Sequence, residues 1–278
     1  MEYSILRTWA FAHKVMENGM STQIVVMGAG GRMGSTITRM VRDSKDLSLA
    51  GVVERNTDAY PELERLGCPV SADPAAVLGP GMVMIDFTAP EASLDGARKA
   101  AEAGAAHVIG TTGLSEDHKA ALEALARKTP IMWSPNMSVG VNALLQVLPA
   151  LAKALGDGYD MEMVEIHHNK KKDSPSGTAM RLAECLTEAR GWSLEETACY
   201  HREGIIGERP HKEIGLQTLR GGDVVGVHTV YFMGPGERIE VTHQAHSREN
   251  FAGGALRAAR WLVGQKPGKL YSMRDVLG

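Results

Sequence analysis

Short apolar runs and amphipathic stretches alternate along the first half of the chain. Short, predominantly apolar runs predict buried strands at residues 23–27, 49–53, 82–87, 106–109 and 131–133. Ala-rich or amphipathic segments between them predict helices at residues 35–42, 91–103 and 116–128. Strands that alternate with helices of this length imply right-handed crossovers and a parallel sheet, with ligand-binding loops at the carboxyl ends of the strands.

The pattern changes after residue 138, where long helices and alternating strands replace the short apolar runs. The predicted elements are a long apolar helix at 139–155, a strand at 161–166, a helix after Gly177, strands at 224–233 and 238–244, a helix at 251–263 and a short tail at 271–277. The two alternating strands flank a Gly-Pro-Gly-Glu hairpin signal. This mixture predicts a second domain of the α+β class, and the last two segments could return to the first domain.

Composition narrows the classes of function. The chain has 278 residues, and its formal net charge of −3 provides no polyanion-binding signature, so we do not expect a nucleic-acid partner. The three cysteines, Cys68, Cys185 and Cys199, show no metal-ligand spacing, which fits a reducing cytoplasm without disulfides or a metal site. No run is expected to reach the roughly 20 apolar residues of a membrane span, so we predict no membrane partner.

A glycine-rich turn follows the first predicted strand. In Gly28-Ala29-Gly30-Gly31-Arg32-Met33-Gly34 the third glycine of the usual G-x-G-x-x-G spacing is displaced by one position. Such a turn also occurs in nucleotide-free α/β proteins, but the flanking strand and helix favour dinucleotide binding. Glu54 ends the second strand, about 20 residues further on, where a ribose-binding acid is expected. Arg55 suits a 2′-phosphate or is a solvated charge, so NADH and NADPH both stay possible cofactors.

A second cluster of polar residues lies in the tract from Glu162 to Ala179. The pair His167 and His168 follows a predicted strand, three lysines come next, and Ser176 is placed to cap the following helix. Main-chain N–H groups at the start of that helix, at Gly177 and Thr178, suit a carboxylate ligand. Adjacent strand residues point to opposite faces, so the two histidines are not expected to share one role. Periodicity does not distinguish Lys170, Lys171 and Lys172, and a solvated charge run is the default interpretation.

These motifs, in this order, resemble the 4-hydroxy-tetrahydrodipicolinate reductase family, also called the dihydrodipicolinate reductase family, of the lysine and diaminopimelate pathway. The resemblance covers residues 23–278. It rests on the E-x-x-E-x-H-H-x-x-K-x-D-x-P-S-G-T-A pattern at 162–179. Supporting motifs are GAGGRMG at 28–34, DFTAPE at 86–91, GTTG at 110–113, NMSVGVN at 136–142 and REGIIGER at 202–209.

The resemblance implies roles for individual residues. His167 and Lys171 fall on the family's acid–base groups, while His168, Gly177 and Thr178 fall on the substrate carboxylate site. The implied nucleotide contacts are Gly28, Ala29, Gly30, Gly31, Arg32, Met33, Glu54, Arg55, Gly110, Thr111, Thr112, Ser134, Pro135, Asn136 and Met137. Many members of the family carry phenylalanine where Met137 stands.

The resemblance also implies a fold, an activity and an assembly. We expect an α/β protein with a Rossmann-like dinucleotide-binding domain (21–138 and 248–278) and an α+β domain with a mixed sheet for substrate binding and oligomerisation (139–247). Residues 1–20 are expected to be an extension, either disordered or a mis-assigned start. The implied activity is NAD(P)H-dependent reduction of 4-hydroxy-tetrahydrodipicolinate, a cyclic dicarboxylate, to tetrahydrodipicolinate by a cytoplasmic homotetramer.

Two other classes of function stay open from the residues alone. One is a different nicotinamide-dependent dehydrogenase acting on a small molecule, which would need another catalytic constellation than the tract at 162–179. The other is a non-enzymatic protein that senses the nucleotide and signals through its second domain. No DNA-reading helix or basic face in the sequence supports the sensor.

Overall fold

The computed structural model describes residues 21–278, so the predicted extension at 1–20 lies outside the described residues. The described chain forms two compact units. The first contains the residues up to Val139 together with Glu249–Gly278, and the second contains Gly140–Arg248. Each unit is described by itself below.

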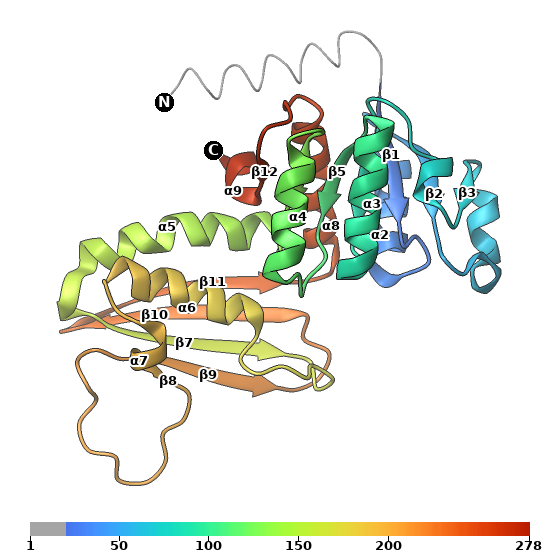
Figure 1. Cartoon of the computed structure of the whole chain (residues 1–278). Helices are drawn as coiled ribbons and strands as arrows, with labels where there is room; N and C mark the ends of the chain where they lie inside the picture. The colour runs from blue at the N-terminus through green and yellow to red at the C-terminus, as the bar shows by residue number, and fades with distance from the viewer. Residues whose placement is uncertain (1–20) are drawn as a thin grey trace. The chain divides into compact units, whose positions relative to one another are not determined.

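A parallel sheet of seven strands forms the centre of the first unit, in the order β12-β6-β5-β4-β1-β2-β3 (Figure 1). The strands are β1 (Thr22–Met27), β2 (Leu47–Val53), β3 (Val70–Ser71), β4 (Val83–Asp86), β5 (Ala106–Ile109), β6 (Ile131–Trp133) and β12 (Leu270–Tyr271). The order reverses direction at β1, between β2 and β4, as it does in doubly wound nucleotide-binding sheets.

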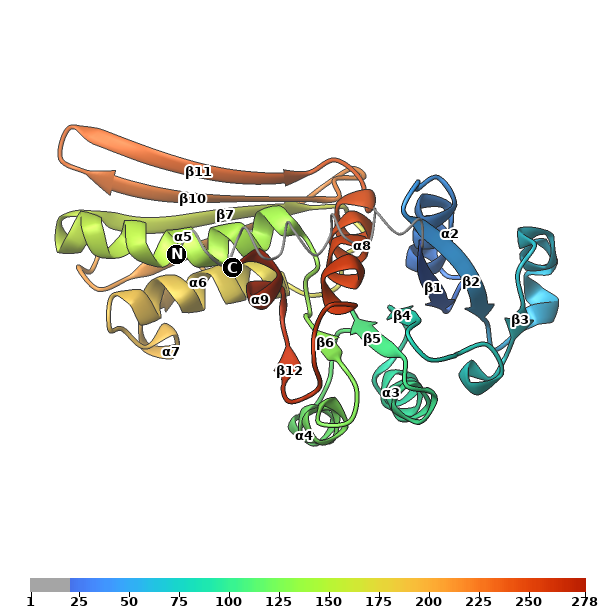
Figure 2. The ribbon, with the colours of Figure 1, turned by 90° about the horizontal axis from the view of Figure 1, so that it is seen from above.

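Helices cover both faces of this sheet (Figure 2). They are α2 (Arg32–Arg42), α3 (Pro90–Ala103), α4 (Glu116–Ala126), α8 (Glu249–Leu262) and α9 (Met273–Leu277), with the short 3-10 helices η1 (Thr57–Ala59), η2 (Pro61–Leu66) and η3 (Pro74–Ala76). α2 and α8 pack on one face and α3 and α4 on the other. Pro90 at the first helical position and the left-handed Gly104 define the two ends of α3.

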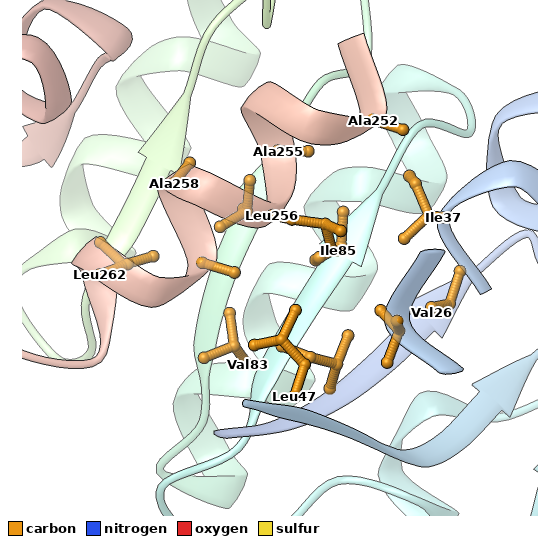
Figure 3. Close-up of a cluster of buried hydrophobic side chains, with 14 of the residues drawn as sticks. Val26, Ile37, Leu47, Val83, Ile85, Ala252, Ala255, Leu256, Ala258 and Leu262 are labelled. Atoms are coloured by element: carbon orange, nitrogen blue, oxygen red, sulfur yellow. The ribbon is translucent and has the colours of Figure 1, made fainter. Parts of the chain in front are cut away.

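Helix α8 closes the core on its face of the sheet, although it is far from the strands in sequence. Figure 3 shows Ala255 and Leu256 of α8 beside Val83 and Ile85 of β4. Small alanine side chains on this helix allow its backbone to approach the sheet closely, and Ile37 of α2 extends the same cluster. The segment 251–263, which was predicted to return to the first domain, therefore lies in a core helix of the first unit.

The second unit is built on a mixed sheet of five strands in the order β11-β10-β7-β9-β8. The strands are β7 (Asp160–His167), β8 (Ala198–Cys199), β9 (Ile214–Arg220), β10 (Gly226–Gly234) and β11 (Glu237–Ala245). β10 runs antiparallel to both β7 and β11, while β9 runs parallel to β7 and β8. The sheet is accompanied by α5 (Val139–Leu155), η4 (Gly156–Gly158), α6 (Gly177–Ala189) and α7 (Leu194–Thr197). Together the two units confirm the predicted fold class.

The two faces of this second sheet differ. Helices α5 and α6 lie on one side of this sheet (Figure 1). Met161 and Met163 of β7 are buried on that side, in a cluster with Leu148 of α5 and Leu182 of α6. The alternate residues of β7, such as Val164, point to the opposite face. No helix covers that opposite face among the described residues.

The prediction that no segment is long and apolar enough to span a membrane is wrong for α5. Residues 139–158 meet that criterion by length and composition. One such helix is weak evidence, because core helices can pass the same test. Leu148 and Ala152 of α5 are fully buried in the core of the second unit, and Leu144 and Leu151 pack against them. One apolar face of α5 thus packs on the sheet of the second unit.

Candidate functional site

The glycine-rich turn joins β1 to α2 in the first unit. Gly28 has φ +70, a left-handed conformation that favours glycine, and its carbonyl accepts the Gly31 N–H at 3.0 Å. Helix α2 begins at Arg32, three residues earlier than predicted, so Gly34 lies in its first turn. A Cβ atom at Gly34 would lie 2.0 Å from the Gly28 carbonyl oxygen. The displaced third glycine is therefore required for the close approach of helix and turn.

The Glu54 carboxylate reaches this turn from the end of β2. Its Oε2 accepts the Gly30 N–H at 3.0 Å, and its Oε1 accepts the Asn56 N–H at 3.3 Å. Arg55 is exposed beside it, and Arg32 is exposed at the start of α2. A main-chain turn at a helix N-terminus suits a pyrophosphate, and an adjacent carboxylate suits ribose hydroxyls. The residues present therefore fit a nicotinamide dinucleotide.

The loop after β5 presents mainly its backbone. Thr111 is 3% exposed, and its Oγ1 accepts the Ser93 hydroxyl at 2.7 Å. Its carbonyl accepts the Trp133 indole N–H at 3.0 Å. Gly110 lies on the Phe87 ring, where a Cβ atom would approach a ring carbon to 2.3 Å. Thr112, which is exposed, is the member of this predicted set whose side chain faces solvent.

The loop after β6 is held by its own hydrogen bonds. The Ser134 hydroxyl donates to the Asn136 carbonyl at 2.8 Å, and the Asn136 Oδ1 accepts the Ser138 N–H at 2.8 Å. Pro135 is exposed. Met137 is 1% exposed, and its side chain belongs to the core of the first unit. Like Ala29, which is also buried there, Met137 offers its backbone rather than its side chain to a ligand.

In the second unit, β7 ends at His167 and α6 begins at Gly177. The Ser176 hydroxyl caps α6 by accepting the Ala179 N–H at 3.1 Å, so Gly177 and Thr178 are its first two residues. Main-chain N–H groups of the first turn point out of a helix end, where they favour anions. The predicted carboxylate site therefore has the expected helix start.

Glu165 lies at the centre of the hydrogen bonds around His167. It is 1% exposed, and its Oε2 accepts the His167 Nδ1–H at 2.6 Å. Arg220 at the end of β9 donates to both carboxylate oxygens, at 2.8 Å each, and the Ser176 N–H donates to Oε1 at 2.9 Å. Burial opposes the ionisation of Glu165, but these donors outweigh it and lower its pKa to about 2. Glu165 is therefore a carboxylate at neutral pH.

His167 faces the helix-covered side of the sheet and is 8% exposed. Burial lowers its pKa, the charges of Lys171 and Arg220 lower it further, and Glu165 opposes them. Because the Glu165 carboxylate can only accept, His167 carries its hydrogen on Nδ1, and Nε2 is the nitrogen left for proton exchange. His168 follows the strand end, where its N–H donates to the Val224 carbonyl at 2.8 Å. The two histidines thus occupy different environments, as the alternation of strand residues predicts.

The three lysines also differ in their surroundings. The Lys171 Nζ donates to both carboxylate oxygens of Asp173 at 2.9 Å, and its side chain is 19% exposed. Lys170 and Lys172 are exposed. Arg220 also donates to the Asp173 carbonyl at 2.9 Å, so the loop that carries Lys171 is tied to the Glu165 centre. The lysine that the family resemblance selects is the sheltered one.

Glu165, Arg220 and His228 belong to this cluster, although the sequence predicted no role for them. His228 is 4% exposed, and its Nε2 lies 2.9 Å from the Ser176 hydroxyl. Its ring centroid lies 5.2 Å from that of His167. The E-x-x-E-x-H-H spacing was a usable signal for Glu165, because residues two apart on a strand share a face. No group of three or more metal-ligating residues suited to a metal ion is found among residues 21–278.

A protein that combines a doubly wound nucleotide fold with a buried, hydrogen-bonded cluster of ionisable side chains on a separate unit falls in the class of nicotinamide-dependent oxidoreductases. Residues 22–137 match the family model described as Dihydrodipicolinate reductase, N-terminus, and residues 140–277 match Dihydrodipicolinate reductase, C-terminus. The chain belongs to the dihydrodipicolinate reductase family, whose curated members are named 4-hydroxy-tetrahydrodipicolinate reductase. The family uses reduced nicotinamide dinucleotides, and the resemblance stated from the sequence is confirmed.

Curated relatives match over their full length. The 4-hydroxy-tetrahydrodipicolinate reductase of Nitratidesulfovibrio vulgaris strain Miyazaki F is 66% identical over 260 residues, which are 93% of this chain and 100% of the relative. That of Lawsonia intracellularis is 52% identical over 260 residues, with the same coverage of both chains. The two alternative classes of function, another dehydrogenase and a nucleotide sensor, are therefore set aside.

Solved structures support the fold. The dipicolinate-bound dihydrodipicolinate reductase from Paenisporosarcina sp. TG-14 is similar with a TM-score of 0.72 at 21% identity, covering 91% of this chain and 98% of that one. A probable dehydrogenase from Thermotoga maritima is similar with a TM-score of 0.60 at 12% identity, covering 91% and 92%.

Proposed function

We propose that the chain catalyses the NAD(P)H-dependent reduction of 4-hydroxy-tetrahydrodipicolinate to tetrahydrodipicolinate, with His167 and Lys171 as acid–base groups. The observation that carries these roles is the hydrogen-bonded assembly at the end of β7, where a buried histidine and a sheltered lysine precede a capped helix start. Reduced nicotinamide, when bound, supplies the hydride. The net change is loss of water from the substrate and addition of one hydride and one proton.

The start of α6 suits one carboxylate of the substrate. Gly177 and Thr178 begin the helix, and Gly177 is exposed, so its main chain is accessible to a ligand. The positive charge of Lys171 favours binding of a dianion, and His168 can donate a hydrogen bond from its ring. These residues fix the orientation of the ring, which reduces the entropic part of the barrier.

His167 and Lys171 are the side chains proposed to transfer the proton. Hydride addition to a conjugated C=C–C=N system moves electron density toward nitrogen. The site therefore needs a proton donor to complete the reduction. His167 can exchange a proton at Nε2, because Glu165 holds the hydrogen on Nδ1. Lys171 brings an ammonium group whose partner, Asp173, holds it with two hydrogen bonds. General acid–base help of this kind contributes roughly 10²- to 10⁴-fold to a rate.

Substitutions at these two positions test the roles. His167→Gln and Lys171→Ala should each lower kcat by about 10²-fold while the dissociation constants of NADH and NADPH stay unchanged. Lys172→Ala removes an exposed lysine from the same loop and serves as the matched control. Stopped-flow reduction of freshly generated substrate measures kcat, and cofactor fluorescence measures binding. Wild-type turnover in both site variants would remove the acid–base assignment.

The cofactor contacts are proposed from the first unit. Glu54→Ala should weaken both dinucleotides, because the adenine ribose of each keeps a 3′-hydroxyl that can donate a hydrogen bond to the Glu54 carboxylate. Arg55→Ala should weaken chiefly NADPH, whose 2′-phosphate an exposed guanidinium can pair with. Titration of each variant with each cofactor separates the two effects. An unchanged preference after the Arg55 substitution would exclude this residue as the phosphate contact.

We further infer that copies of the chain assemble through the second unit, as a homotetramer. The face of its sheet away from α5 and α6 carries Val164, Val227 and Tyr231, and Leu219 on the same face is 47% exposed. A surface of this kind favours a protein partner. Val164→Lys should lower the mass measured by light scattering, whereas Val147→Lys on the exposed side of α5 should not. An unchanged mass after the first substitution would refute this interface.

A cytoplasmic location is part of the same proposal. All three cysteines are free thiols, which agrees with a reducing compartment. Cell fractionation with an antibody against the chain tests it.

A further inference from the structure

We propose that Glu165 is a positioning residue for the reduction: its carboxylate holds His167 in one tautomer and, through Arg220, holds the loop that carries Lys171. This role rests on the proposed function of His167 and Lys171. Glu165 itself is buried beneath the site, and its contacts are with protein groups, so it acts through other residues.

Several hydrogen-bond donors point at the Glu165 carboxylate. Oε2 accepts from His167 and Arg220, and Oε1 accepts from Arg220 and the Ser176 main chain. The Thr218 hydroxyl lies 3.4 Å from Oε1 as a further donor. A carboxylate has about four lone-pair positions and no hydrogen, so every position is filled by a donor. An acceptor-only group is needed here.

These donors come from three different secondary-structure elements. His167 ends β7, Arg220 ends β9, and Ser176 caps α6, so Glu165 joins the ends of two strands to the start of a helix. Arg220 extends the connection, because it donates to the Asp173 carbonyl, and the Asp173 carboxylate holds Lys171. The proposed acid–base pair and the carboxylate-binding helix start therefore share one buried support.

An amide of the same shape cannot replace the Glu165 carboxylate without a change in its hydrogen bonds. In Glu165→Gln one oxygen becomes an NH₂ group that can no longer accept. Placed at Oε1, the NH₂ would face two fixed donors, Arg220 and the Ser176 N–H, and could donate only to the more distant Thr218 hydroxyl. Placed at Oε2, it would face one fixed donor, Arg220, and His167, which can adapt by moving its hydrogen to Nε2. Glu165→Gln should therefore reverse the His167 tautomer.

The groups that face His167 determine how its titration should be interpreted. They are Glu165 on the same strand, Arg220 on β9, His228 on β10 and Lys171 on the following loop. Burial and the two cationic side chains lower the pKa of His167, whereas Glu165 raises it. Loss of the carboxylate charge should shift the titration of His167 to lower pH.

The chain offers a matched control on the same strand. Glu162 is held by Arg202 through two hydrogen bonds, of 2.7 and 3.0 Å, and by Arg209 at 3.0 Å. It lies over Gly215 on the opposite face of the sheet, because a Cβ atom at Gly215 would meet its Oε2 at 1.8 Å. Glu162→Gln disrupts a comparable ion-pair cluster without touching His167.

Nitrogen-15 NMR of the histidine rings and steady-state kinetics test the proposal on the full chain. Glu165→Gln should move the His167 hydrogen from Nδ1 to Nε2 and lower its titration midpoint, while Glu162→Gln leaves both unchanged. kcat should fall by about 10-fold or more with the cofactor dissociation constant unaltered. In a His167→Gln background the same change should cost less than in the wild type, because one of the two residues it positions is gone.

Two outcomes would overturn the inference. One is a wild-type His167 tautomer and titration in folded Glu165→Gln, and the other is an equal loss of kcat from Glu162→Gln with an unchanged His167 spectrum in both variants. The NMR measurements need no substrate. They therefore test whether Glu165 fixes the His167 tautomer even if His167→Gln retains full turnover and the proposed acid–base roles are wrong.

Discussion

His228 provides the sharpest test of the energetics of the second unit. It is 4% exposed, its Nε2 lies 2.9 Å from the Ser176 hydroxyl, and its Nδ1 has no hydrogen-bond partner among the described residues. Burial lowers its pKa from the ordinary 6.5 to about 4, and the neighbouring His167 acts in the same direction. The folded protein therefore keeps this histidine neutral at a pH where an unfolded chain protonates it.

The sign and size of the effect follow from these two values. A depressed histidine pKa means that the unfolded state binds the proton first, so stability is lost as the pH falls through 6.5 toward 4. Between pH 7 and pH 5 the loss from His228 alone should be about 2 kcal/mol. The substitution His228→Gln keeps a hydrogen-bonding group near Ser176 but cannot titrate. The fall in the free energy of unfolding between these two pH values should therefore shrink by about that amount.

Urea unfolding followed by far-UV circular dichroism at pH 7 and pH 5 measures the difference. Protein concentration is held constant, because assembly also contributes to apparent stability. Subtracting the variant from the wild type cancels the other groups that titrate in this range. His211→Gln, a change at an exposed histidine, is the control and should leave the pH dependence as it is. An identical fall in His228→Gln and wild type would refute the neutral buried histidine.

Three further predictions concern packing and reactivity. Gly34→Ala should lower the free energy of unfolding by about 1–3 kcal/mol and weaken dinucleotide binding, since its Cβ would collide with the Gly28 carbonyl; chemical denaturation and cofactor titration measure these. Leu148→Ala should cost about 2–5 kcal/mol in urea unfolding, because the side chain is fully buried. Burial raises the pKa of Cys185 to about 11, so iodoacetamide at pH 8 should label it only after unfolding, as mass spectrometry would show.

Elements with a strong local apolar pattern were predictable from the sequence. Ala106–Ile109, Ile131–Trp133 and Val139–Leu155 have the predicted bounds, because each is predominantly apolar. The strand β9 was missed. Its sequence, IGLQTLR, contains a glycine and several polar residues, and it is a strand because it pairs with β7 through seven residues. Local pattern cannot report a pairing between segments about fifty residues apart.

The candidate site shows the same limit. Motif spacing located the glycine turn and the tract at 162–179, since both depend on residues close in sequence. The supporting role of Glu165 depends on Arg220, which lies 55 residues further along the chain. Likewise, the contact of His228 with Ser176 joins β10 to the start of α6. Such long-range contacts are products of the sheet order, which single-sequence patterns do not specify.

The return of α8 to the first unit has a consequence for how the protein is made. Seven residues of α8 are buried in the first unit, including Ala252, Leu256 and Leu262, yet the helix is translated after the whole second unit. During synthesis the second unit, residues 140–248, can complete its own sheet while one face of the earlier sheet still lacks its cover. The nascent chain therefore carries exposed Val83 and Ile85 until α8 has left the ribosome. For the interval between those events, this half-finished sheet exposes apolar surface of the kind that chaperones protect from aggregation.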